Sequence, residues 1–144
     1  MRTTDTIMDM VYAVPPETRA RAIFVCDHKT AADLRKMVDG ELFAIMVAAH
    51  ALADYPLQGD FLSKAKNHTA PIPGVPWYQA LGAHSAIHAG FVGVITGSIW
   101  LGLAEFIVHT TTDYAKCAGR ISFNTDQAIH IGCKLAWAFL VLSF

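Results

Sequence analysis

The sequence predicts an all-α fold, a four-helix antiparallel membrane bundle made of two similar helical hairpins and preceded by a short polar N-terminal segment. Hydrophobic residues make up 53% of the 144 residues and charged residues only 16%, against about 25% charged residues in an average soluble domain. The apolar runs between Pro and Gly breaks are longer than strands, and Ala and Gly are too frequent in them for a sheet. The prediction is therefore helical throughout.

The first 40 residues form the polar segment. They carry 12 of the 23 formal charges, and residues 41–144 carry the other 11. We therefore expect two parts, a polar N-terminal segment with short helices at 1–40 and a four-helix membrane domain at 41–144. Within the first part, residues 16–39 are expected to form one or two short amphipathic helices, because Thr30 with Asp33 is typical of a helix start.

Proline and glycine residues divide the second part into helices. The first helix is expected from Glu41 to Tyr55, where Pro56 would end it, and a short helix is expected near 60–66 in the polar loop that follows. The second helix is expected to begin at Pro76, because proline suits the first helical turn, and to run to about residue 96 before a Gly97 turn.

The third and fourth helices complete the expected bundle. Gly119 is expected to stop the third near residue 117, and Asn124 or Thr125 to cap the fourth, which runs to 144. Helices two to four each have about 20 residues, enough to cross about 30 Å of hydrocarbon. The expected location is therefore a membrane, as a multi-pass protein with the lipid bilayer as a partner.

Each expected helix carries one pair of residues of metal-ligating type, spaced i, i+4, so that both side chains share one helix face. The pairs are His50 and Asp54, His84 and His88, His109 and Asp113, and Asp126 and His130. Antiparallel packing brings all four pairs to the same end of the bundle. Buried ionisable groups are costly unless they meet a partner or a metal. The sequence therefore predicts a site for one or two divalent ions, with zinc, manganese or iron suiting His and Asp ligands.

Further polar residues flank these pairs. Glu105 lies one turn before His109 and is expected to be a general base or the outer partner of that imidazole. Lys66 and Lys116 are expected to hold an anionic substrate such as a phosphate, although lysines at such positions also mark a membrane surface. A buried His–Asp hydrogen-bond network without metal, or a proton or ion path, remains open as an alternative.

The order and spacing of these residues resembles a known family. The matching pattern is His50-x-x-x-Asp54-Tyr55-x-Leu57-Gln58, then Lys66, His84-x-x-x-His88, His109-x-x-x-Asp113-Tyr114-x-Lys116 and Asp126-Gln127-x-x-His130. It is similar to a small family of bacterial and phage membrane proteins known as a domain of unknown function, number thirty-three-oh-seven. The resemblance covers about residues 42–142 and implies a multi-helix protein of the bacterial inner membrane without an established activity. A looser likeness points to membrane-bound metal-dependent hydrolases.

Two functions follow as expectations. The first is a membrane-embedded, metal-dependent hydrolase of a phosphoester or lipid-linked substrate. The second is a non-enzymatic membrane protein, either a metal or proton carrier or a phage-type factor that binds a host membrane protein. A bis-histidine haem protein would leave the carboxylates unexplained. No nucleic-acid partner is expected, because 11 basic residues against 12 acidic residues leave no cationic surplus.

Overall fold

The computed structural model describes the backbone of residues 28–143 and the side chains of residues 40–141. These residues form α-helices and one π-helical turn, and no strand occurs among them, which confirms the all-α prediction. The elements are α3 (His28–Leu52), the π-helical turn η1 (Ala53–Leu57), α4 (Gly59–Ala65), α5 (Trp77–Thr96), α6 (Ile99–Cys117) and α7 (Phe123–Ser143). The chain divides into the units Met1–Val38 and Asp39–Phe144, and every side chain discussed below belongs to the second.

The first long helix differs from the prediction at both of its ends. It begins at His28 and runs without a break through Gly40, whereas one or two separate short helices were expected within residues 16–39. The part of that expectation that concerns residues 16–27 lies outside the described residues. At the other end, Pro56 does not stop the helix but lies inside η1. Proline lacks an N–H donor, and the chain passes it in a π-helical turn, a feature frequent at functional sites. That turn carries Asp54.

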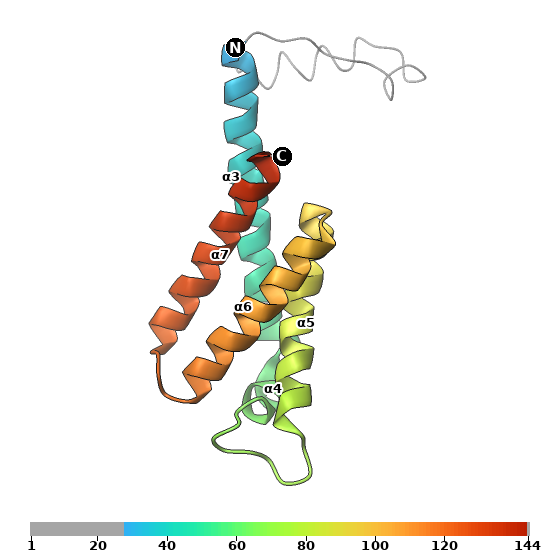
Figure 1. Ribbon diagram of the computed structural model, residues 1–144, viewed down its shortest axis with the longest axis vertical. Coiled ribbons are helices and arrows are strands. Elements are labelled where there is room, and N and C mark those ends of the chain that lie inside the picture. The colour runs from blue at the N-terminus through green and yellow to red at the C-terminus, as the bar shows by residue number, and fades with distance from the viewer. Residues whose placement is uncertain (1–27, 144) are drawn as a thin grey trace, which may run out of the picture. The chain divides into compact units, whose positions relative to one another are not determined.

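Helices α5 and α6 form a closely packed antiparallel hairpin (Figure 1). Gly97 ends α5 in the left-handed conformation, with φ 66°, and the Ser98 side chain accepts a hydrogen bond from the Leu101 backbone N–H. The two helices approach closely because Gly102 faces α5. A Cβ atom at Gly102 would lie 3.0 Å from the Ala89 carbonyl oxygen and 3.3 Å from Gly93 Cα.

Helix α7 follows α6 after a turn at Gly119, which has φ 70°. It begins at Phe123 rather than at the expected Asn124 or Thr125, because Ser122 is the residue that caps it. The Ser122 Oγ accepts a hydrogen bond of 3.1 Å from the Thr125 backbone N–H. Successive long helices of the Asp39–Phe144 unit run in opposite directions, as the colour order in Figure 1 shows. The expected antiparallel helical bundle is therefore present.

The membrane part of the prediction is wrong. Within residues 28–143, no helix combines the length and the hydropathy that a bilayer span requires. A physical reason is visible in α5 and α6, where buried polar residues lie within the apolar sequence: His84 and His88 in α5, and Glu105 and His109 in α6. The expected inner-membrane location and bilayer partner are accordingly withdrawn.

Candidate metal centre

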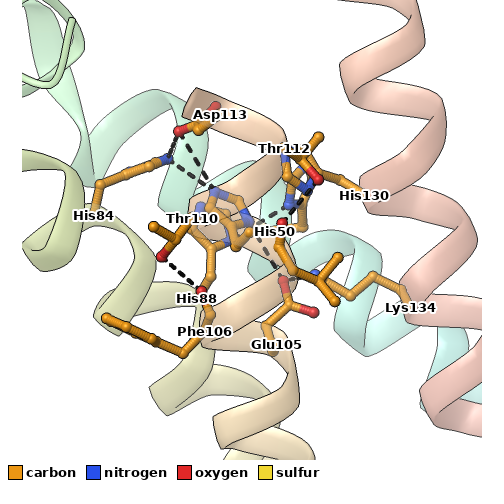
Figure 2. Close-up of polar contacts among 12 residues, drawn as sticks. His50, His84, His88, Glu105, Phe106, Thr110, Thr112, Asp113, His130 and Lys134 are labelled. Carbon is orange, nitrogen blue, oxygen red and sulfur yellow. Dashed lines mark hydrogen bonds and ion pairs between the residues drawn. The ribbon is translucent and has the colours of Figure 1, made fainter. Parts of the chain in front are cut away.

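The centre of the bundle is polar and buried. Ten ionisable side chains there are at most 4% exposed: His50, Lys66, His84, His88, Glu105, His109, Asp113, Asp126, His130 and Lys134. They include seven of the eight predicted ligands, and the eighth, Asp54, has a side chain 13% exposed. Figure 2 shows many of these side chains pointing toward one another from different helices. The sequence pairs therefore converge as predicted.

The first group of ligating atoms joins η1, α5 and α6. It consists of Asp54, His84, His88 and His109, each of which offers an atom within 4.8 Å of the others. Asp54 Oδ1 lies 3.1 Å from His88 Nε2 and 3.5 Å from His84 Nε2, and the Nε2 atoms of His84 and His109 are 3.1 Å apart. Ligands that surround one ion tetrahedrally at 2.0–2.2 Å are themselves about 3.3–3.6 Å apart. The observed separations are close to that spacing.

His50 contacts the first group from α3. Its Nδ1 atom lies 3.3 Å from His88 Nδ1, and its Nε2 atom lies 3.4 Å from Asp54 Oδ2 and 3.4 Å from Gln127 Oε1. The Gln127 amide also donates a 3.0 Å hydrogen bond to Asp54 Oδ2. His50 and Gln127 thereby contact Asp54 at Oδ2, whereas His84 and His88 lie beside its Oδ1 atom. Gln127, which entered the sequence pattern only as the neighbour of Asp126, therefore contacts a predicted ligand directly.

A second group lies between α6 and α7. Asp113, Asp126 and His130 each offer an atom within 4.8 Å of the others. Two predicted lysines enter this group directly: Lys116 Nζ lies 2.6 Å from Asp113 Oδ1 and 2.7 Å from Asp126 Oδ2, and Lys66 Nζ is paired with Asp113 Oδ2. Lys66 also donates a 2.6 Å hydrogen bond to Gln58 Oε1. Both lysines therefore belong to the buried cluster.

Glu105 lies behind His109, next to Lys134. Its Oε1 atom is 3.4 Å from His109 Nδ1 and 2.5 Å from Lys134 Nζ, and its Oε2 atom accepts a 2.7 Å hydrogen bond from Trp137 Nε1. Figure 2 shows Glu105 beside Lys134. This position suits the outer partner of a ligating histidine. Sequence reasoning missed Trp137, although its spacing of three residues from Lys134 places it on the same face of α7 and a buried indole N–H needs an acceptor.

Burial and hydrogen bonding set the charges of these groups. Burial lowers the pKa of His88 to about 4 and that of His109 to about 3. Burial alone would raise the pKa of Asp54, but hydrogen bonds from His84 and His88 outweigh it and hold that pKa well below its usual range. Neutral imidazoles beside an ionised carboxylate are the forms in which these side chains ligate metals.

An open polar pocket of about 380 Å³ connects the cluster with the surface. Asp54, Gln58, Lys66, Lys116 and Gln127 are among its lining residues. Glu105 is not among them, so the pocket gives no support to the expectation that it acts as a general base. An anion that entered this pocket would meet the lysines before the histidines.

Hydrogen bonds within the protein do not account for the whole cluster. Among the described residues, several buried atoms have no hydrogen-bond partner: Nδ1 of His84 and of His109, Oδ1 of Asp126, and both ring nitrogens of His130. Buried polar groups in native proteins are nearly always satisfied. The Asp126 and His130 atoms belong to the second group and are free to ligate an ion there, whereas a self-sufficient His–Asp network would satisfy them. The Nδ1 atoms of His84 and His109 are not the atoms by which these rings meet in the first group, and His109 Nδ1 lies 3.4 Å from Glu105 Oε1. The donor set fits a divalent cation.

Comparisons of the chain with protein-family models, with curated proteins and with solved structures find no match. The function is therefore inferred from the geometry and chemistry of the site. The resemblance to the membrane-protein family stays a prediction.

Proposed function

We propose that the protein binds a divalent metal ion at Asp54, His84, His88 and His109 and acts as a metal-dependent hydrolase of a phosphoester. The observation that carries the proposal is the convergence of these four ligating atoms within 4.8 Å, in the core of the bundle. One carboxylate with three imidazoles suits zinc, manganese or iron.

The balance of buried charges supports this position for the ion. Each of three buried carboxylates has a lysine partner: Glu105 pairs with Lys134, and Asp113 and Asp126 pair with Lys66 or Lys116. Asp54 has no lysine or arginine partner among the described residues, and only histidines and Gln127 contact it. A buried charge needs a compensating charge. The uncompensated negative charge thus lies in the first group.

The residues around the pocket define what could be hydrolysed. A divalent cation supplies such a site with Lewis acidity and with a water that ionises near neutral pH. Lys66 and Lys116 line the pocket and are suited to hold the oxygens of an anionic substrate. Gln127, through its bond to Asp54, keeps that carboxylate oriented. Glu105 fixes the ring of His109 from behind.

A phosphorylated small molecule is the proposed substrate class. The pocket is polar at the lysines and is large enough, at about 380 Å³, for a ligand of small-molecule size. The expectation of a lipid-linked substrate required a site at the edge of a bilayer. It is not kept, because no described helix is long and apolar enough to span a bilayer.

The test is hydrolysis of phosphomonoester and phosphodiester chromogenic substrates by the full chain with Mn²⁺, Zn²⁺ or Fe²⁺ and with EDTA. Metal-dependent turnover that His84→Ala abolishes and His68→Ala leaves intact would support the proposal. His68 is the matched control, because its ring stacks on Tyr114 at 3.9 Å and it belongs to none of the ligand groups. Metal bound without turnover on either substrate class would favour a non-enzymatic metal-binding protein.

A further inference from the structure

The group formed by Asp113, Asp126 and His130 is filled by lysine ammonium groups. Lys116 Nζ bridges a carboxylate of α6 and a carboxylate of α7, at 2.6 and 2.7 Å, and Lys66 pairs with the other oxygen of Asp113. We propose that this group is a second divalent-cation site and that Lys66 and Lys116 occupy the place of the second ion. The inference rests on the proposed function for the first ion.

The lysines leave ligating atoms of this group without partners. Among the described residues, Asp126 Oδ1 and both ring nitrogens of His130 have no hydrogen bond, although Asp126 is 0% and His130 1% exposed. His130 Nε2 lies 3.4 Å from Asp126 Oδ1, the spacing of neighbouring ligands on one ion. Burying an imidazole with neither nitrogen bonded is costly. A cation between these two atoms would give a partner to His130 Nε2 and to Asp126 Oδ1.

Asp113 places the second group beside the first. Its Oδ2 atom, which pairs with Lys66, also lies 3.4 Å from His84 Nε2 and 3.9 Å from His109 Nε2. Two-metal hydrolytic sites hold their ions about 3.5–4 Å apart. Asp113 belongs to the second group and contacts two histidines of the first, so its carboxylate is placed to lie between two such ions.

The pocket gives the displaced ammonium groups a place to go. Lys66 and Lys116 both line it, and the Lys116 side chain is already 23% exposed. Gln58, which accepts a hydrogen bond from Lys66, lies on the pocket wall. Entry of a second cation would therefore turn the two lysines from the carboxylates toward an anion in the pocket. Binding of that anion and of the second ion would support each other.

The experiment measures bound Mn²⁺ by equilibrium dialysis of the full chain, for the wild type and the double variant Lys66→Met, Lys116→Met. We expect the wild type to bind one equivalent of Mn²⁺ tightly. The second equivalent of Mn²⁺ should bind to the double variant about 10–100-fold more tightly than to the wild type. Lys64→Met is the matched control, because the Lys64 side chain is 72% exposed and its partner is Asp60, at 3.9 Å. The control should bind Mn²⁺ as the wild type does.

The outcomes separate the two proposals. No tight Mn²⁺ in the wild type would overturn the first site. One equivalent in both the wild type and a folded double variant would overturn the second site and leave the first standing. Adding Asp126→Asn to the double variant should remove the second equivalent alone. If the double variant does not fold with or without Mn²⁺, Lys116→Met carries the test, and no gain of affinity for a second ion there would overturn the inference.

Discussion

The Nε2 atoms of His84 and His109 lie 3.1 Å apart, although the two residues belong to antiparallel helices and are separated by 25 positions in the sequence. Two imidazoles that face each other through the same ring nitrogen can share only one proton, so at most one of them donates. The same two atoms are ligating atoms of the group completed by Asp54 and His88. A cation bound between these two Nε2 atoms would explain why they lie so close together.

Replacing Asp54 tests the charge argument for the first ion. Asp54→Asn keeps the size of the side chain and removes the one carboxylate of the cluster that has no lysine partner among the described residues, on a side chain that is 13% exposed. We expect the affinity for Mn²⁺ or Zn²⁺, measured by calorimetric titration, to fall by about 100-fold or more, since an anionic ligand is lost. Asp60→Asn is the control, because the Asp60 side chain is fully exposed. An equal loss in both variants would contradict the assignment.

The stability of the protein in EDTA should fall as the pH falls from 7 to 4. The pKa of His88 is lowered from 6.5 to about 4 and that of His109 to about 3, so the unfolded chain binds more protons than the folded chain between these values and 6.5. For each of these histidines, the unfolding free energy then falls by up to about 1.4 kcal/mol for every unit by which the pH is lowered. Below about pH 4.5, protonation of Asp113 and Glu105, whose pKa values are also lowered, removes more.

Urea unfolding followed by circular dichroism at pH 7, 5.5 and 4.5 measures this dependence. His88→Gln should show a shallower loss between pH 6.5 and 4.5 than the wild type, because one of the imidazoles whose pKa burial lowers is absent. A flat profile for the wild type across this interval would contradict the burial of neutral histidines.

The ion pair of Glu105 and Lys134 should be strongly coupled. Lys134→Met leaves a buried carboxylate without its cation, and we expect a loss of about 3–5 kcal/mol of unfolding free energy. Adding Glu105→Gln removes the stranded charge while keeping an acceptor for Trp137, so the double variant should recover part of that loss. Chemical denaturation of the two single variants and the double variant gives the coupling energy. Additive losses would show that the pair does not act as a unit.

The close approach of α5 and α6 predicts a contrast between two glycines. Gly102→Ala would place a Cβ 3.0 Å from the Ala89 carbonyl oxygen, which is backbone and cannot rotate away. We expect a loss of about 1–3 kcal/mol from overpacking. Gly90→Ala, in α5, meets nothing within 4 Å and should stabilise the protein by about 0.5–1 kcal/mol. Thermal melts of both variants decide this, and a Gly102→Ala protein as stable as the wild type would speak against the close helix contact.

The i, i+4 spacing predicted much of this site, because residues four apart must share a helix face and antiparallel helices must bring such faces together. The convergence of His84, His109 and Asp54 follows from that geometry. The lysines were harder to place, since a flexible side chain such as that of Lys66 can reach either solvent or a carboxylate 47 positions away. The membrane expectation failed because helix length and total apolar content do not show how the polar residues interrupt each apolar run.

The most direct test of the central claim is the metal content of the purified full chain, measured by elemental analysis after exposure to Zn²⁺, Mn²⁺ and Fe²⁺ and removal of the excess. The wild type should retain at least one equivalent of one of these ions, whereas His84→Ala and His109→Ala should retain none. Folded wild-type protein that retains no stoichiometric metal would contradict the account, and the buried histidines would then be a proton-sharing network of the core.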